Sequence, residues 1–306
     1  MSFLASCSED DTIKIWDIDT FECIQTLICC NGNFKSIYFN SNNTKLISIS
    51  KNSLVKLWDI DSGECIKTIE NYEYDDYCFL YFSYTSDNTE ILFVVNYEKI
   101  EILDLNSFEI ISILLIEDDG DYNPKSISFS RVNGLIATGS FSGIIKIWNY
   151  STSKVINLLE GHIDTVMTIS FSSDGSKIAS GSRDGVIKIW SFPSCECVHT
   201  LNDNFRFIRS ILFNYDNTKI VSLANNCFVS LWNIENGNIL NSVKIDNGYN
   251  GLIPFNLDGT KIFVATYNGI IKVLDSETFE MVGILVGHSR KITSFNFSNE
   301  IPGSYI

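Results

Sequence analysis

The chain has 306 residues and a net charge of −15, and apolar residues make up 45% of it. Its length suits a barrel or a repeat architecture, and only 4 prolines and no Gly/Ser-rich tract are present to mark a linker. The excess of carboxylates disfavours binding to nucleic acid or anionic membranes, because both require lysine and arginine to neutralise phosphates. The longest apolar runs, such as residues 109–116, are too short to span a bilayer.

The cysteines indicate a reducing compartment. There are 9, an odd number, with no Cys-x-x-Cys pair. Cys23, Cys65 and Cys197 recur at one repeat position, between Glu and Ile or Val, which favours a small apolar thiol on a packed strand. We therefore expect a cytoplasmic protein, with the nucleus as the alternative. Cys195 and Cys197 share one strand without paired histidines nearby, which is weak support for a metal site.

Internal repeats organise the whole chain. A run typical of a β-strand ends in Trp-Asp or a related dipeptide at seven places, 42 or 45 residues apart. These dipeptides begin at Trp16, Trp58, Leu103, Trp148, Trp190, Trp232 and Leu274. Seven periods of about 43 residues account for almost all of the chain.

In chain order, residues 3–28 supply three strand-like segments, and each later unit supplies four. In the unit at 161–201 the four segments are residues 165–171, 177–182, 186–190 and 196–201. Asp184-Gly185, between the second and third segments, is a strong hairpin signal. Residues 287–297 supply one last strand, and a helical period of 3.6 persists nowhere.

Both faces of these strands are rich in Ile, Val and Phe, so both faces of a four-stranded sheet require cover. Stacking similar sheets around an axis provides that cover, which predicts a β-propeller. The segment GHIDTVMTISFSSDGSKIASGSRDGVIKIW, residues 161–190, closely resembles a WD repeat, and the resemblance extends along the chain at varying quality. It implies an all-β, seven-bladed propeller of four-stranded antiparallel blades, similar to G-protein beta subunits, as a single domain over residues 1–306.

The resemblance implies that the two ends of the chain complete one blade. In the family, the strand after Gly-His is the innermost of its blade, and the last blade is usually shared between the termini. Residues 287–306 would supply the inner strand and residues 1–30 the other three. Pairing of the N- and C-terminal strands would then close the ring, which otherwise leaves two unpaired sheet edges.

WD repeats that resemble this one carry a hydrogen-bonded set of His, Ser or Thr, Asp and Trp. Two such sets are predicted, and they consist of His162, Ser180, Asp184 and Trp190, and of His288, Ser6, Asp10 and Trp16. Both keep the Asp four residues after the Ser and six before the Trp. In the second set the histidine lies at the opposite end of the chain, so the set is complete only if the two ends meet. The other blades keep fewer members.

The same residue types could form a hydrolytic triad. A nucleophile needs an exposed oxygen beside an oxyanion hole, whereas the resemblance implies that Trp190 caps Ser180 inside the blade. GSFSG at 139–143 departs from the nucleophile elbow, because Phe141 stands where the serine must be. No phosphate loop, dinucleotide fingerprint or paired-histidine zinc motif occurs. We expect no enzyme activity, no catalytic residue, no cofactor and no metal.

A lysine recurs two residues before the Trp or Leu of the dipeptide. It is present as Lys14, Lys56, Lys146, Lys188 and Lys272. We expect its stem to pack against a neighbouring blade while its ammonium reaches water.

The family usually binds peptides on the face that carries the turns before the first strand and between the second and third strands, which we name the turn face. Aromatic and arginine residues gather at its positions in blades four to seven: Phe141, Arg183, Phe207, Arg209, Tyr249 and Tyr267. Such residues dominate binding energy at interfaces. Turns on the same face form an acidic group that includes Asp76, Asp118 and Asp119. The alternatives are rings packed against adjacent loops, and ordinary solvated acidic loops.

These features predict a non-catalytic scaffold or adaptor that binds a peptide segment or a protein surface through the turn face. The partner would anchor on the aromatic and arginine residues and could extend basic segments over the acidic turns. Nucleic acid, membrane and small-molecule partners are not expected. An enzyme or small-ligand propeller using the central channel would need a ring of acids or histidines, and the inner strands at 34–39, 165–171 and 291–297 show none. A purely structural subunit would use the side or bottom faces.

Overall fold

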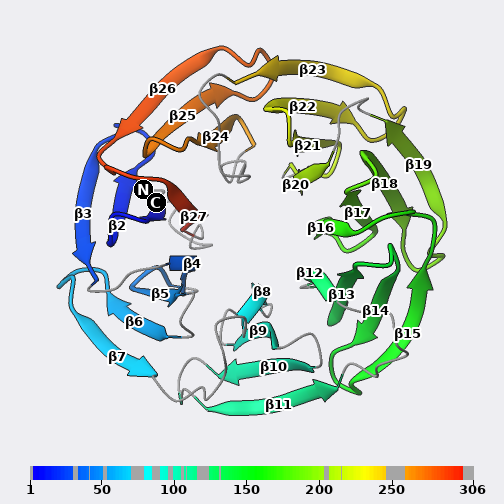
Figure 1. Cartoon of the computed structure of the whole chain (residues 1–306), viewed down its shortest axis with the longest axis horizontal. Helices are drawn as coiled ribbons and strands as arrows, with labels where there is room; N and C mark the ends of the chain where they lie inside the picture. Colours follow the sequence, from blue (N-terminus) through cyan, green and yellow to red (C-terminus); the bar gives the residue numbers. More distant parts are fainter. Residues whose placement is uncertain are drawn as a thin grey trace, which may run out of the picture. The chain divides into compact units, whose positions relative to one another are not determined.

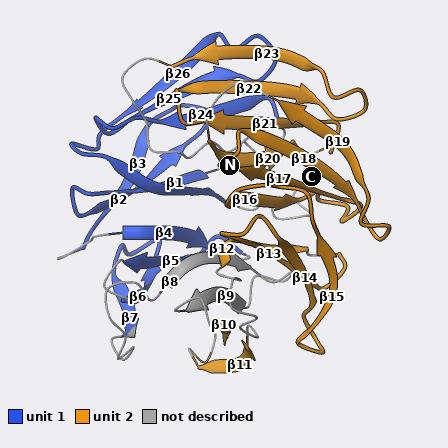
Figure 2. Cartoon of the chain, turned by 45° about the vertical axis from the view of Figure 1, so that its right-hand side comes forward, with its two compact units in different colours: residues 1–78, 247–306 blue, residues 79–246 orange. Residues whose placement is uncertain are grey.

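A computed structural model describes most of residues 3–298, which form 27 strands and no helix in the described part. The gaps are residues 30–33, 41, 51–53, 70–78, 85–89, 96–98, 105–106, 108, 116–123, 131, 203–206, 215 and 246–258. The described residues accordingly include no helix that could cross a bilayer. The chain divides into two compact units, residues 1–78 with 247–306 and residues 79–246, which Figure 2 colours separately.

The first unit contains three antiparallel sheets (Figure 1). One has the strand order β27-β1-β2-β3, with bounds Ile292–Phe297, Phe3–Ser8, Thr12–Asp17 and Cys23–Ile28. The next has the order β4-β5-β6-β7, with bounds Phe34–Phe39, Lys45–Ser50, Val55–Asp59 and Cys65–Ile69. The third has the order β24-β25-β26, with bounds Lys261–Ala265, Ile270–Asp275 and Met281–Val286.

The second unit contains four antiparallel sheets of four strands each. The sheet β8 to β11 has bounds Phe79–Tyr84, Glu90–Val95, Lys99–Asp104 and Ile110–Leu115. The sheet β12 to β15 has bounds Pro124–Ser130, Leu135–Ser140, Ile145–Asn149 and Lys154–Leu159. The sheet β16 to β19 has bounds Val166–Phe171, Lys177–Ser182, Val186–Ser191 and Cys197–Asn202. The sheet β20 to β23 has bounds Ile208–Phe213, Lys219–Ala224, Phe228–Asn233 and Ile239–Lys244. Strands that follow one another in the chain are neighbours in each sheet, which is the connectivity of a propeller blade.

The two ends of the chain meet in one sheet. β27 pairs antiparallel with β1, and Leu4 lies opposite Phe297. The Ser298 amide also donates to the Phe3 carbonyl oxygen at 2.9 Å, and the Phe3 amide donates to Ser298 Oγ at 2.7 Å. The predicted pairing of the N- and C-terminal strands is therefore confirmed.

Six of the sheets have four strands, and the sheet β24-β25-β26 has three described strands. The strand expected to precede β24 falls within residues 246–258, outside the described part of the chain. All-β architecture and four-stranded antiparallel blades are confirmed. Seven complete blades and a single domain over residues 1–306 remain predictions.

The local sequence explains where the hairpin between β17 and β18 turns. In the sheet β16 to β19, Trp190 is the next-to-last residue of the third strand and lies opposite Ile178 on β17 and Cys197 on β19. The turn before this strand contains Gly185 at a φ of 85°, a left-handed conformation that glycine adopts without strain. The Asp-Gly pair therefore fixes where β17 ends and β18 begins.

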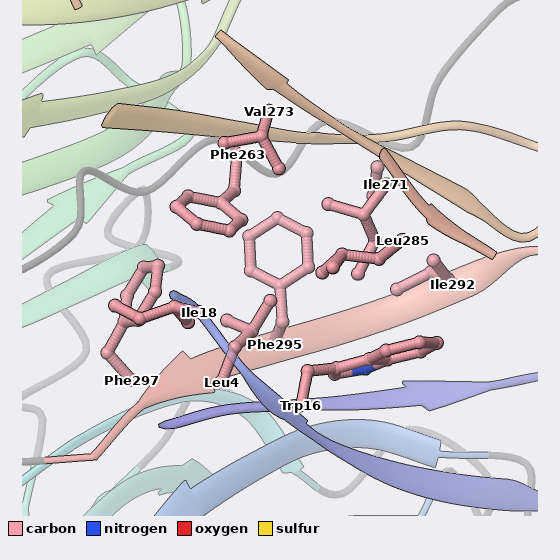
Figure 3. Packing of buried hydrophobic residues seen from close by; sticks show 11 residues of the cluster. Leu4, Trp16, Ile18, Phe263, Ile271, Val273, Leu285, Ile292, Phe295 and Phe297 are labelled. Carbon is pink, nitrogen blue, oxygen red and sulfur yellow. The ribbon is translucent and has the colours of Figure 1, made fainter. Parts of the chain in front are cut away.

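The hydrophobic core lies between neighbouring sheets. In the first unit one cluster joins Leu4, Trp16 and Ile292 of the sheet that contains both chain ends to Phe263 of the next sheet (Figure 3). The rings of Phe263 and Phe297 meet edge to face, with centroids 5.0 Å apart. Apolar residues on both faces of strands such as β1 and β5 are buried in this way, as the sequence pattern predicts.

In the sheets that end in β3, β7, β15, β19 and β23, the fourth strand is the least buried. β19 shows the pattern, because only Leu201 among its six residues is buried. Cys23, Cys65 and Cys197 begin three of these strands, and all three thiols are exposed and free of disulfides. The prediction of a thiol on a packed strand is wrong, because a strand at the edge of its sheet has a neighbouring strand on one side only.

Candidate functional site

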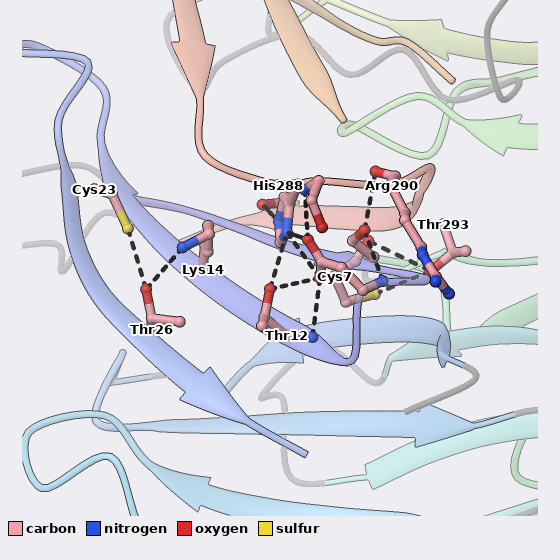
Figure 4. Close-up of polar contacts among 12 residues, drawn as sticks. Cys7, Thr12, Lys14, Cys23, Thr26, His288, Arg290 and Thr293 are labelled. Atoms are coloured by element: carbon pink, nitrogen blue, oxygen red, sulfur yellow. Dashed lines mark hydrogen bonds and ion pairs between the residues drawn. The ribbon is translucent and has the colours of Figure 1, made fainter. Parts of the chain in front are cut away.

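The structure brings together the polar set at the chain ends. Trp16 Nε1–H donates to Ser6 Oγ at 2.7 Å, and Ser6 Oγ lies 2.8 Å from His288 Nε2. His288 Nδ1 lies 3.1 Å from Asp10 Oδ2. This geometry suits an Nδ1–H that donates to the carboxylate and an Nε2 that accepts from the serine hydroxyl. The region around His288 is drawn in Figure 4.

The set within residues 162–190 has the same geometry. Trp190 Nε1–H donates to Ser180 Oγ at 2.8 Å, and Ser180 Oγ lies 2.8 Å from His162 Nε2. His162 Nδ1 lies 3.1 Å from Asp184 Oδ2. One repeat supplies this set, whereas the two ends of the chain supply the other.

Hydrogen bonds keep both carboxylates ionised. Burial raises the pKa of Asp10, but the Thr12 hydroxyl, the Ser289 amide and His288 outweigh burial, and the pKa lies below the usual value for Asp. Burial lowers the pKa of His288, and the neighbouring Asp10 opposes this effect without cancelling it. A neutral imidazole next to a charged carboxylate is the resulting state near neutral pH.

Asp184 behaves in the same way. Burial raises its pKa, but the hydrogen bond from His162 and those from the Val186 and Ile163 amides outweigh burial, so the pKa is lowered. The charge of this carboxylate is satisfied within its own sheet.

The arrangement does not resemble a hydrolytic site. Ser6 and Ser180 are both 0% exposed, and each oxygen already accepts from an indole N–H while bonding a histidine. A serine nucleophile must reach a substrate carbonyl, which neither of these oxygens can do. Three further sheets contain the indole bond, between Trp58 and Ser48, Trp148 and Thr138, and Trp232 and Ser222, each at 2.8 Å.

Arg183 and Phe207 form a stacked pair on the turn face of the second unit. Arg183 lies in the turn between β17 and β18, and Phe207 immediately precedes β20 of the adjacent sheet. The guanidinium carbon of Arg183 is 4.9 Å from the centroid of the Phe207 ring. The Arg183 amide also donates to the Thr165 carbonyl oxygen at 2.8 Å, which holds the turn in place.

Two other predicted residues of this unit are exposed beside a polar neighbour. Phe141, in the turn between β13 and β14, is 42% exposed, and Lys125 Nζ is 5.4 Å from the centroid of its ring. Burial lowers the pKa of Lys125. Arg209 on β20 donates from Nε to Asn225 Oδ1 at 2.7 Å. This bond fixes one edge of an exposed guanidinium.

In the first unit, Tyr267 occupies the corresponding turn between β24 and β25. It is 48% exposed, and Lys291 Nζ is 5.2 Å from the centroid of its ring. Lys125 and Lys291 are not among the predicted partner-binding residues. The sequence feature that could have identified them is a lysine at the start of the first strand of a sheet, in a chain whose neighbouring turn contains an aromatic residue.

Four of the predicted partner-binding residues lie outside the described part of the chain: Tyr249, Asp76, Asp118 and Asp119. They remain predictions from the sequence. Among the described residues, no group of three His, Cys, Asp or Glu side chains is arranged to hold a metal ion.

Sheets built from consecutive strands, closed at the chain ends and carrying a Trp–Ser–His–Asp set, define a β-propeller assembled from sequence repeats. The family model described as WD domain, G-beta repeat matches residues 1–17, 21–59, 119–149 and 153–191. The chain belongs to the WD40 repeat family of β-propellers. A search of curated proteins finds no match to the chain.

Proposed function

We propose that this chain is a non-catalytic scaffold or adaptor that binds a peptide segment or a protein surface through the turn face. WD40 propellers are typically protein-interaction scaffolds and are usually non-catalytic. The observation that carries the proposal for this chain is the Arg183–Phe207 stack, an exposed guanidinium held on an aromatic ring by two adjacent sheets. Aromatic and arginine side chains of this kind are the most frequent binding hot spots.

The charge around this stack supports a partner with acceptor groups. The chain has 37 Asp and Glu residues against 22 Lys and Arg residues, yet neither Arg183 nor Arg209 forms an ion pair within the described part of the chain. Stacking on Phe207 fixes the plane of the Arg183 guanidinium and leaves its N–H edge for a ligand. The partner would therefore place a carbonyl or carboxylate oxygen at this edge.

The proposal also includes the acidic turns. Asp76, Asp118 and Asp119 would attract basic segments of the partner from solution, because rim charges mainly increase the association rate. The same partner would then offer an acceptor to Arg183 and basic residues to the acidic turns. The alternative, an enzyme or small-ligand propeller that uses the central channel, has no observation in its favour among the described residues.

The test compares substitutions on the turn face with one on an outer strand. A partner captured from cell extract is purified, and its binding to the immobilised chain is measured for Arg183→Ala and Phe207→Ala, with His199→Ala on β19 as the control. Loss of an anchor should cost about 2 kcal/mol, or about thirtyfold in Kd. Unchanged binding by both turn-face variants, with loss from substitutions on β11 or β15, would move the interface to the outer strands.

A further inference from the structure

Two recurring sequence positions that looked unrelated meet on the outer side of the sheets. The exposed cysteine begins the fourth strand, and the recurring lysine lies on the third strand next to it. Cys197 lies opposite Trp190, and Lys188 lies opposite Thr200. The register thus places the lysine and the cysteine near each other on adjacent strands of this sheet.

The contact is closest in the sheet β16 to β19. Lys188 Nζ lies 4.0 Å from Cys197 Sγ and donates to Thr200 Oγ1 at 3.1 Å. Thr200 Oγ1 is 3.6 Å from Cys197 Sγ, so one hydroxyl contacts both groups. The thiol is free and exposed, and the ammonium lies 5.9 Å from the centroid of the Trp190 ring. The tryptophan and the threonine thus hold the amine beside the thiol.

The sheet that contains both chain ends repeats this arrangement. Lys14 Nζ donates to Thr26 Oγ1 at 3.0 Å, and Cys23 Sγ is 3.6 Å from the same oxygen (Figure 4). The same three residue types thus occur at the same register in both units of the chain.

Other sheets separate the amine from the exposed thiol. Lys56 donates to the buried Cys29 Sγ at 3.2 Å, while the exposed Cys65 Sγ is 3.5 Å from Thr68 Oγ1. In the sheet β24-β25-β26, Lys272 lies opposite Ile284, and Met281 stands at the cysteine position. The chain therefore contains three cases for comparison. In the first, Cys197 lies beside Lys188. In the second, Cys65 is exposed but Lys56 bonds another thiol, and in the third, Lys272 has no cysteine at the matching position.

We propose that Cys197 and Lys188 form an acyl-transfer modification site, at which an acyl group from a small acyl thioester passes through Cys197 to Lys188. The Cys197 thiolate attacks the carbonyl carbon of the donor, a new C–S bond forms, and the donor thiol leaves. Lys188 Nζ, after releasing a proton to solvent, attacks the same carbon. A C–N amide bond then forms, the C–S bond breaks, and the Cys197 sulfur leaves as a thiolate that takes up a proton.

The geometry favours the second step. The carbonyl carbon of an acyl group on Cys197 is one bond from a sulfur that lies 4.0 Å from Lys188 Nζ. This carbonyl carbon can thus approach Lys188 Nζ to the distance of about 3–3.5 Å that a reactive conformer requires. Thiolates are also the strongest nucleophiles that a protein surface offers near neutral pH. Because transfer within the pair is intramolecular, Lys188 gains an advantage that Lys272 lacks.

The experiment incubates the full chain with acetyl-coenzyme A at pH 8 and follows acetylation of each lysine by peptide mass spectrometry. Acetylation of Lys188 should be at least about tenfold faster than that of Lys272, because effective molarities of intramolecular reactions are large. Cys197→Ala should lower the Lys188 rate to that of Lys272. In Lys188→Arg, a hydroxylamine-sensitive thioester should accumulate at Cys197.

Cys65 and Lys56 serve as the internal control, because a thioester at Cys65 should not pass to Lys56. Cys197 lies on the outer strand β19 and Lys188 on the neighbouring strand β18. Melting curves verify that each variant is folded. Equal rates at Lys188 and Lys272, or a Lys188 rate that Cys197→Ala leaves unchanged, would overturn the proposal. A thioester at Cys197 that never reaches Lys188 would overturn it as well.

Discussion

A buried tryptophan N–H needs an acceptor, and this requirement accounts for much of the residue pattern in the repeats. In five sheets the indole donates to a serine or threonine hydroxyl at 2.7–2.8 Å. Where Leu103 and Leu274 replace the tryptophan, the hydroxyl positions hold Phe93 and Val264 instead. Donor and acceptor are therefore lost together. Histidine and aspartate are added in two sheets and extend the bond into a network.

His162→Ala should destabilise the chain without affecting any binding activity. The substitution removes one hydrogen-bond partner from Ser180 and one from Asp184, whose other partners remain. Loss of a hydrogen-bond partner in the interior costs about 1–3 kcal/mol. Chemical denaturation measures the change, with His199→Ala, at a half-buried position of the outer strand β19, as the control. A hydrolytic activity lost at unchanged stability would instead indicate a catalytic site.

Stability should fall as the pH is lowered from 7.5 to 5.5. The folded pKa of His288 is lowered, so the unfolded chain takes up its proton first, near the ordinary histidine value of about 6.5. The unfolded state then binds more protons, which disfavours folding as the pH falls. The pKa values of Asp10 and Asp184 are also lowered, so their contribution is lost only below the ordinary Asp value of about 3.9.

Thermal unfolding at the two pH values measures this effect. His288→Gln should show a smaller drop in Tm between pH 7.5 and 5.5 than the unsubstituted chain. His199→Ala should show the same drop as the unsubstituted chain. A Tm that is constant or rises toward pH 5.5 would contradict the proposed neutral state of His288.

At the scale of elements, the strand β27 links the end of the chain to its start. It pairs with β1, and its side chains Phe295 and Phe297 belong to the same core cluster as Leu4 and Trp16. One strand thus contributes ladder hydrogen bonds and apolar contacts, while His288 just before it completes the polar set. Removing the strand would expose the edge of β1 and one side of this cluster.

Truncation after Val286 should abolish cooperative unfolding or cause aggregation. It removes β27 and His288 together, whereas truncation after Ser298 retains both and serves as the matched control. Circular dichroism melts and light scattering measure the two outcomes. If the chain truncated after Val286 melts like the control, the terminal pairing contributes little to stability.

At the scale of the whole molecule, the acidic turns and the aromatic residues of the turn face should affect different steps of binding. The acidic turns should set the association rate, and the aromatic residues should set the dissociation rate. Asp118→Asn combined with Asp119→Asn should slow association of a basic partner and flatten its salt dependence, because rim charges act over long range. Phe207→Ala should mainly accelerate dissociation. Binding kinetics at two salt concentrations distinguish these effects, and the triple variant tests whether they are independent. Unaltered kinetics in both variants would remove the turn face from the interface.

The amino-acid sequence by itself determined the repeat, the class of fold and the limits of many strands. The four segments expected at 165–201 became β16 to β19, with shifts of at most one residue at any end. These features depend on contacts between neighbours in the sequence, such as the Asp184-Gly185 turn and the alternation of apolar residues. The polar set at 162–190 is also foreseeable, because a single repeat carries all four of its members.

Tertiary structure alone decided which residues from distant positions meet and which side chains face solvent. It stacked Arg183 on Phe207 and turned Lys56 toward Cys29 instead of Cys65. It also left Cys197 exposed beside Lys188, although its repeat position suggested a packed thiol. These outcomes depend on how one strand lies against another and on which strand forms the edge. A pattern of period two specifies the alternation of side chains along a strand, but it does not specify what covers each face.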